Sequence, residues 1–254
     1  MTALFHDLIA FFCDNWPTGA AVLTWGPLAL IWSLACLSLA GWLKQRHGWR
    51  TGYTRKLFHF VTFASAAVIH SAGGTRAVCL FGAATSVVVL HAVWRGQGNR
   101  LYEAMAREKD APHRSRYILL PWLATLLGGL ISNAFFGPAA LAGYLVAGLG
   151  DAAGEPVGTR FGRHTYRVPA VRGVSAARSW EGSAAVFAVS ALALACGGFA
   201  GSVGGWSLAR VGTALVIAAV AAAAEAVSPH GWDNLTMQVI PSWLVARLIL
   251  NAVP

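Results

Sequence analysis

Two segments of this chain place carboxylates at positions that suit the binding of a cation. Asp151 and Glu155 lie in GDAAGEPVGTRFG, and Glu225 and Asp233 lie in EAVSPHGWDN, which contains no Lys or Arg. Mg²⁺ prefers carboxylate and amide oxygens together with the phosphates of a substrate. Glu225 and Asp233 therefore call for a cation, and Asp151 and Glu155 are expected to face a cation or a polar cavity.

Two further segments carry positive charges at spacings that suit phosphate. In RKLFH, Arg55, Lys56 and His59 are three or four residues apart, so all three can point to one side of a helix. Membrane-surface anchoring would account for Arg55 and Lys56 alone, but less well for His59, which lies one turn deeper.

The second basic segment, RSWEGS, puts Arg178, Ser179, Glu181 and Gly182 at the expected start of a helix. The free N–H groups and the dipole of a helix N-terminus favour phosphate. Ordinary capping by Ser179 and Glu181 is the alternative interpretation.

Three glycines follow Asp151 at intervals of four residues. Gly154, Gly158 and Gly162 would share one helix face and allow a second helix, or a phosphate, to approach the backbone closely. Pro156 removes a backbone donor, which predicts a break in the helix near Glu155. Broken helices inside membranes tend to line binding sites. The alternative is that the glycines form only a packing seam and that Asp151 caps a loop.

The elements that must position these residues are membrane-spanning helices. The chain has 254 residues, of which 56% are hydrophobic and 11% charged, and a mean hydropathy of +0.56. Apolar stretches of about 18 to 20 residues, the length that spans a bilayer, recur along it. We expect an all-α transmembrane bundle of about seven to eight helices, forming a single integral membrane domain over residues 1–254. The expected spans are Ala20–Leu43, Leu57–Ala72, Ala77–Val93, Tyr117–Phe136, Pro138–Val157, Ser183–Ala200, Trp206–Val227 and a short last one, Val239–Val253.

Charge distribution predicts the orientation of this bundle. Basic residues are concentrated in the connections after the first, third and fifth spans, whereas the alternate connections hold Arg76 and Arg210 alone. The positive-inside rule makes the basic side cytoplasmic and puts the N-terminus outside. The net charge of +9 is thus explained by membrane topology, with no nucleic-acid partner. Residues 1–18 lack a basic start and a cleavage site, so they are expected to form a short interfacial helix.

The fifth span cannot end at Asp151, because Pro138 to Gly150 supplies only about two-thirds of the residues that a bilayer requires. Asp151 is therefore expected below the level of the headgroups, on the same side as most of the acidic residues. The loop at 158–182 is basic, and its segments YRVP and AVRGV are expected to pair as a β-hairpin. The four cysteines are far apart and are expected to be core residues.

Taken together, the four segments resemble the CTP-dependent lipid-alcohol kinases, which include dolichol kinase, phytol kinase and the yeast-type diacylglycerol kinase and are related to the phosphatidate cytidylyltransferases. The resemblance covers about residues 50 to 240. It rests on Arg-Lys-x-x-His, on Gly-Asp with spaced glycines, on basic-Ser-x-Glu-Gly-Ser and on a late Glu with Gly-x-Asp-Asn. Arg178 stands where the family commonly has Lys, and Glu155-Pro156 replaces small or apolar residues.

The resemblance implies transfer of the γ-phosphate of CTP to an isoprenoid or similar lipid alcohol, with Mg²⁺ as cofactor. The lipid tail is expected to enter laterally between spans. The implied metal ligands are Asp151, Glu155, Glu225 and Asp233, and the implied catalytic residues are Asp151, Glu181 and His59. The implied nucleotide- and phosphate-binding residues are Arg55, Lys56, Gly158, Arg160, Gly162, Arg163, Arg178, Ser179, Gly182 and Asn234.

Two alternatives compete with the kinase hypothesis. A cytidylyltransferase would use the same acids and CTP, but the chain lacks the His-Gly-Gly-x-x-Asp-Arg-x-Asp-like tail typical of that group. A transporter or flippase would use Asp151 as an ion site, and it would be expected to show internal repeats and polar residues on both sides of the membrane. None of these motifs specifies the oligomeric state.

Overall fold

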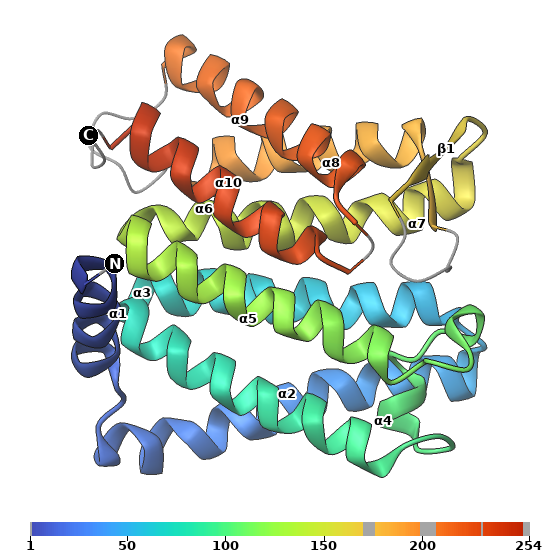
Figure 1. Ribbon diagram of the computed structural model, residues 1–254. Coiled ribbons are helices and arrows are strands. Elements are labelled where there is room, and N and C mark those ends of the chain that lie inside the picture. The colour runs from blue at the N-terminus through green and yellow to red at the C-terminus, as the bar shows by residue number, and fades with distance from the viewer. Residues whose placement is uncertain (1, 170–175, 199–206, 230, 251–254) are drawn as a thin grey trace.

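The computed structural model describes residues 2–169, 176–198, 207–229 and 231–250, which form a bundle of helices with a small two-stranded sheet at one end (Figure 1). The elements in chain order are α1 (Thr2–Asn15), α2 (Gly19–His47), α3 (Thr51–Arg95), α4 (Arg100–Glu103), η1 (Glu108–Asp110), α5 (Arg116–Phe136), η2 (Gly137–Ala139), α6 (Ala140–Leu145), η3 (Val146–Gly150), α7 (Asp151–Phe161), β1 (Thr165–Val168), β2 (Ala176–Ser179), α8 (Trp180–Ala193), η4 (Leu194–Gly198), α9 (Leu208–Val227) and α10 (Asp233–Leu248).

Five helical stretches are long and apolar enough to cross a membrane: Gly19–His47, Thr51–Arg95, Arg116–Phe161, Trp180–Gly197 and Leu208–Val227. Two of them, at 45 and 46 residues, are about twice the length that one crossing requires. Each turns back at a glycine with positive φ, Gly74 in α3 and Gly137 after α5, so each forms two antiparallel arms (Figure 1). The predicted all-α membrane bundle of about seven to eight helices is confirmed.

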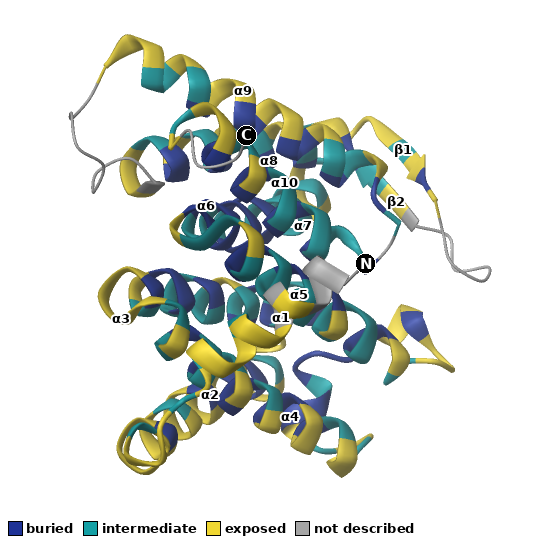
Figure 2. Cartoon of the chain, turned by 60° about the vertical axis from the view of Figure 1, so that its left-hand side comes forward, coloured by how far each residue is buried: buried dark blue, intermediate teal, exposed yellow. Residues whose placement is uncertain are grey.

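Lipid contact explains the outer surface of this bundle. Within the most apolar windows of the five stretches, 17% to 33% of residues are buried inside the protein. Figure 2 shows the exposed residues along the outward faces and the buried ones between helices. A helix that is apolar on all sides is stable where its outer face meets hydrocarbon instead of water.

The last helix begins earlier than the sequence indicated, at Asp233 instead of Val239. Its first turns carry polar side chains, which lower the local hydropathy, so a hydropathy pattern does not indicate that the helix begins there. The helix packs these groups against α5: Asn234 donates to Thr125 Oγ1 at 2.8 Å, and Gln238 Nε2 donates to the Thr125 carbonyl at 3.1 Å. The end of the predicted span, after residue 250, lies outside the described residues.

The predicted hairpin is present, but its second strand lies further along the chain. Strand β1 pairs antiparallel with β2, with Thr165 opposite Ser179 and Val168 opposite Ala176. The first strand therefore corresponds to the expected YRVP segment, while the second begins at Ala176. Residues 170–175, which hold the whole of the expected AVRGV strand, lie outside the described part of the chain.

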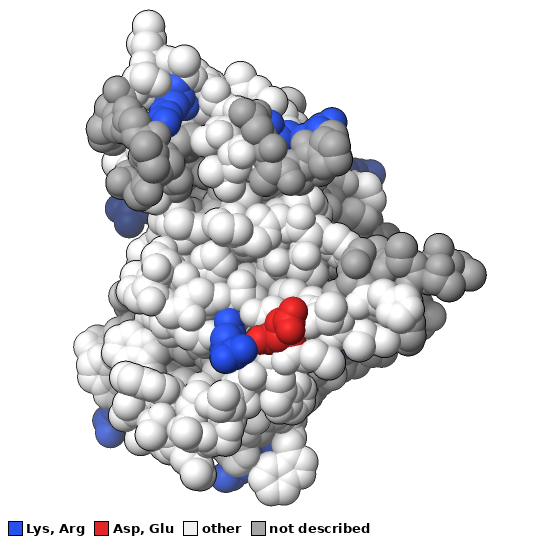
Figure 3. All heavy atoms as spheres, turned by 90° about the vertical axis from the view of Figure 1, so that its left-hand side faces the viewer, with Lys and Arg blue, Asp and Glu red and all other residues white. Residues whose placement is uncertain are grey.

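The two ends of the bundle differ in charge. One end, on the right in Figure 1, collects the starts of α3, α5, α8 and α10, the ends of α7 and α9, and the hairpin. The opposite end is crossed by α1, which runs across the direction of the long helices (Figure 1). Seen from that side, the surface carries few charged side chains (Figure 3).

Candidate functional site

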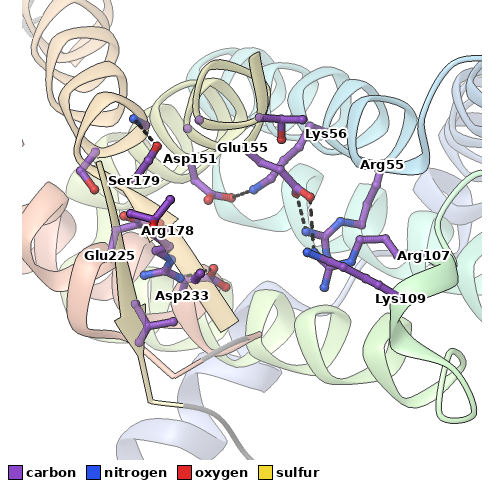
Figure 4. Close-up of a pocket in the computed structure, with 18 of the residues that line it drawn as sticks. Arg55, Lys56, Arg107, Lys109, Asp151, Glu155, Arg178, Ser179, Glu225 and Asp233 are labelled. Atoms are coloured by element: carbon purple, nitrogen blue, oxygen red, sulfur yellow. Dashed lines mark hydrogen bonds and ion pairs between the residues drawn. The ribbon is translucent and has the colours of Figure 1, made fainter. Parts of the chain in front are cut away.

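A charged pocket of about 200 Å³ lies at the end of the bundle that holds the hairpin. It collects residues that are up to 178 positions apart in the chain, from Arg55 to Asp233 (Figure 4). Its charged lining residues are Arg55, Lys56, Arg107, Lys109, Asp110, Asp151, Glu155, Arg178, Glu225 and Asp233. Acids and bases from all four predicted segments therefore meet at one place.

Three carboxylates converge inside this pocket. Asp151 at the start of α7, Glu225 near the end of α9 and Asp233 at the start of α10 each offer one oxygen, and these oxygens lie within 4.8 Å of one another. Asp151 and Glu225 are buried. Like charges so close repel each other unless a cation lies between or beside them. Hard carboxylate oxygens from three helices form a donor set that fits Mg²⁺.

The helix that carries Asp151 is irregular just before it, and not at Pro156 as the sequence suggested. Residues Val146–Gly150 form a π-helical turn, and α7 then continues without interruption through Pro156 to Phe161. The wide turn lies where neighbours press on the backbone: a Cβ at Gly148 would come within 2.3 Å of Phe63 Cβ, and one at Gly150 within 2.0 Å of Ser190 Oγ. The irregular turn thus lies where the helix packs closely against α3 and α8. The prediction of a break near Glu155 was wrong in position, because the irregularity lies before Asp151.

The basic start of α3 pairs with the acids of α7. Lys56 Nζ donates to Asp151 Oδ2 at 2.5 Å, and Arg55 Nη2 donates to Glu155 Oε2 at 2.7 Å. His59 Nε2 lies 3.5 Å from Asp151 Oδ2 and bonds to the Ala147 carbonyl at 2.8 Å. Glu155 is therefore tied to guanidinium groups and stands outside the three-carboxylate cluster.

Arg178, the last but one residue of β2, holds the other two acids of the cluster. Its Nε donates to Glu225 Oε1 and its Nη2 to Asp233 Oδ2, both at 2.9 Å. Its Nη1 is buried and has no hydrogen-bond partner among the residues that the structure describes. The next residue, Ser179, caps α8 by accepting from the Gly182 N–H at 3.1 Å, so the capping interpretation holds for its side chain.

The spaced glycines bring α8 against α7. A Cβ at Gly154 would come within 2.7 Å of Val186 Cγ2, and one at Gly158 within 2.9 Å of Ser179 Oγ. The partner at this face is therefore a helix. Gly154, Gly158 and Gly182 nevertheless line the pocket, because the seam opens into it. Gly162 lies beyond the end of α7 and does not line the pocket.

Several predicted residues lie elsewhere. Glu181 bonds to Nδ1 of His164, the residue before β1, at 2.8 Å and does not line the pocket. Arg160 lies over the Phe161 ring, 5.4 Å from its centroid, and Arg163 is exposed. Asn234 lines a smaller cavity beside Lys56 and His59, but its amide joins α10 to α5. Glu181, Arg160 and Arg163 lie at or next to helix ends. The sequence predicts where a helix ends, but it does not predict the direction in which a side chain points there.

The sequence analysis missed the contribution of the connection between α4 and α5. Arg107 Nη1 donates to Glu155 Oε1 at 3.3 Å, and Arg107 Nε donates to Asp110 Oδ2 at 2.9 Å. Lys109 lines the pocket, and partial desolvation, with the Arg107 guanidinium nearby, lowers its pKa. The alternating charges of Arg107-Glu108-Lys109-Asp110 were the available signal, but a run of this kind is usually solvated.

Comparisons with protein-family models, with curated proteins and with solved structures give no match for this chain. The fold and the pocket define the class of this protein: it is a helical membrane bundle with a charged pocket at one end.

Proposed function

We propose that this chain is a membrane-embedded kinase that transfers the γ-phosphoryl group of CTP to the hydroxyl of an isoprenoid or other lipid alcohol, such as a polyprenol, dolichol or phytol. The observation that carries the proposal is the convergence of Asp151, Glu225 and Asp233 within 4.8 Å in a pocket that also collects guanidinium and ammonium groups. Phosphoryl transfer requires mainly alignment and charge stabilisation, which such a set of residues supplies. The choice of CTP as donor rests on the resemblance of the motifs.

Mg²⁺ is the cofactor in this proposal, and Asp151, Glu225 and Asp233 are the residues that would hold it. Bound there, it would neutralise charge on the triphosphate. Lys56 and Arg178 would face the phosphate oxygens, and both already lie beside the cluster. The unpartnered Nη1 of Arg178 supports this role, because a buried guanidinium N–H without a partner is costly and a phosphate oxygen would satisfy it.

The proposed reaction forms a bond between the alcohol oxygen and the γ-phosphorus. The bond from that phosphorus to the β–γ bridging oxygen breaks, CDP leaves, and the hydroxyl proton passes to a carboxylate. We assign this carboxylate to Asp151, because Glu181, the other predicted base, lies outside the pocket. His59, 3.5 Å from Asp151 Oδ2, would act as a positioning residue for it.

The proposal also assigns sides of the membrane. Nucleoside triphosphates are cytoplasmic, and the connections rich in Lys and Arg lie at the end of the bundle that holds the pocket. We therefore propose that this end faces the cytoplasm and that the N-terminus lies outside. Labelling of single-cysteine variants in intact cells would test this, since a cysteine at position 46 should be protected from an impermeant reagent.

The decisive experiment gives the purified protein, reconstituted in bilayers, CTP labelled at the γ or the α position together with a panel of prenols. We expect label in the lipid from γ-labelled CTP alone. Transfer from α-labelled CTP to a lipid phosphate would show a cytidylyltransferase instead. No transfer to any alcohol, by protein shown to be folded and inserted, would contradict the proposal.

A further inference from the structure

An apolar groove lies on the opposite face of α7 from the charged pocket. Asp151, Gly154 and Glu155 line the pocket, whereas Ala152, Ala153 and Pro156 line a cavity of about 710 Å³ between α7 and the start of α3. The Glu155-Pro156 pair therefore has one residue on each side. Two alanines leave the groove open where larger side chains would close it.

This groove and the pocket share one lining residue. Lys56 lines both cavities, and its Nζ bonds to Asp151 inside the pocket. A hydroxyl group at this end of the groove would therefore lie beside the side chain of Lys56. Lys56 thus links an apolar site to the place where the proposed transfer occurs.

The groove also continues in the other direction, along the lipid-facing side of α3. Phe60 lines the first groove and also a second, apolar one of about 970 Å³ between α2 and α3. On α3 this second groove follows Phe60, Ala64, Val68 and Ala72, which share one face because they are four residues apart. It ends near Arg76, whose guanidinium donates to the carbonyl of Asp14.

The dimensions of the path indicate its occupant. From Lys56 to Gly73, α3 rises about 25 Å at 1.5 Å per residue, which is most of the hydrocarbon thickness of a bilayer. The two grooves share Phe60 as a lining residue and lie one after the other along α3. A single long chain laid along this face of α3 would contact both grooves.

We infer that these joined grooves are the acceptor site: they bind a lipid alcohol with one long hydrocarbon chain, its hydroxyl beside Lys56 and its chain lying along α3 past Phe60. This inference rests on the proposed function for the role of the hydroxyl. The binding site itself is defined by the grooves.

Photo-crosslinking tests the site without requiring turnover. The full-length protein in phosphatidylcholine bilayers is photolysed, without nucleotide, with a long-chain polyprenol that carries a diazirine near its tail. We expect adducts on the α3 face around Ala64 and Val68, which unlabelled polyprenol removes and excess phosphatidylcholine or diacylglycerol does not. Removal by either of these two-chain lipids, or adducts spread equally over α9, would overturn the inference.

A filled-groove variant sharpens this test. Ala153→Phe places a ring in the groove and should reduce the competed adducts about tenfold, equivalent to about 1.4 kcal/mol, and raise the KM for prenol but not for CTP. Ala219→Phe, exposed on α9, is the matched control and should change neither. Should Ala153→Phe not fold, the wild-type adduct map decides alone.

The two proposals can fail separately. Groove adducts in a protein that transfers phosphate to no alcohol would contradict the proposed kinase function. Phosphate transfer in a protein whose adducts lie elsewhere would contradict the acceptor site and leave the kinase proposal standing.

Discussion

Two networks of ion pairs lie at the same end of this bundle, and they are built differently. The first, which we call the outer clamp, consists of Lys44, Glu103, Glu108 and Arg114. Lys44 Nζ lies 2.5 Å from Glu108 Oε1, and Arg114 Nη2 lies 2.6 Å from Glu103 Oε2. In the outer clamp each acid has a cation within 2.6 Å, and Lys44 also lies 3.8 Å from Glu103 Oε2. In the pocket, three carboxylates instead converge on one another and share Lys56 and Arg178.

The difference separates a structural network from one suited to a ligand. Paired charges in the outer clamp hold α2, α4 and the following connection together. Burial alone would raise the pKa of Glu103 and of Glu108, but bonds from Arg114 and Lys44 lower both. In the pocket the convergence of like charges opposes stability, and a buried atom of Arg178 lacks a partner among the described residues. Such an arrangement suits a site that a bound cation and a bound anion would complete.

The largest effect is expected from Asp151→Asn. Loss of the proposed base and metal ligand should lower kcat/KM for phosphoryl transfer by at least a hundredfold, or about 3 kcal/mol in the transition state. The assay measures transfer of the γ-label with equal amounts of membrane-inserted wild type and variant. Equal amounts are needed because the substitution also removes the carboxylate partner of Lys56, which can affect folding. Glu181→Gln is the matched control and should stay within a few-fold of wild type. Equal activity of Asp151→Asn and wild type would contradict the assignment of Asp151 as base and metal ligand.

Mg²⁺ should stabilise the folded protein without any nucleotide. A ligand at a hundred times its Kd adds about 2.7 kcal/mol to the free energy of unfolding. Thermal unfolding in detergent with Mg²⁺ or with a chelator, at matched ionic strength, measures this. Asp233→Asn should lose the effect, and an equal gain in that variant would place Mg²⁺ elsewhere.

Glu225→Gln should separate stability from activity. Glutamine keeps an oxygen for Arg178 Nε but removes one of three converging negative charges. We therefore expect the free energy of unfolding to rise or to change by less than about 0.5 kcal/mol, while activity falls at least tenfold. A parallel fall in stability and activity would show that Glu225 is a structural partner like those of the outer clamp.

The smallest effect is expected from Glu103→Gln in the outer clamp. Loss of the pair with Arg114 should cost about 0.5 to 1 kcal/mol of stability at pH 7 and leave activity unchanged. Because the folded pKa of Glu103 is lowered from 4.5, its contribution is present above that pH and is lost as the pH falls through the lowered pKa. The two proteins should therefore differ less in their free energy of unfolding at pH 4 than at pH 7.

Much of the fold follows from the sequence, because apolar length is a local property. The reversals at Gly74 and Gly137 fall between the predicted spans, and α2, α5 and α9 match their predicted ranges closely. The start of α10 was missed because Asn234 and Gln238 are polar, and their partners on α5 lie more than 100 positions away. A hydropathy pattern does not predict a helix whose polar side chains are hydrogen-bonded to residues far away in the sequence.

The site was partly predictable for a related reason. Glu225 and Asp233 stood out because their segment has no Lys or Arg, and Asp151 stood out because the fifth span had to continue past it; the three do meet. Arg160 and Glu181 were implied by the resemblance of the motifs, but the direction of a side chain depends on helix rotation, which tertiary packing sets. Arg107 is buried by contacts with α7 that no local pattern encodes.

The π-helical turn at Val146–Gly150 acts as a one-residue phase adjustment in the helix that enters α7. Each residue of an α-helix advances its side chain by about 100°, so the same residues wound as a regular α-helix through this turn would carry every later position round by about that angle. Asp151 would then point away from Glu225 and Asp233, and Gly150 would take its place. The chemistry of the pocket thus depends on a single additional backbone unit, which explains why such insertions recur in helices that carry functional groups.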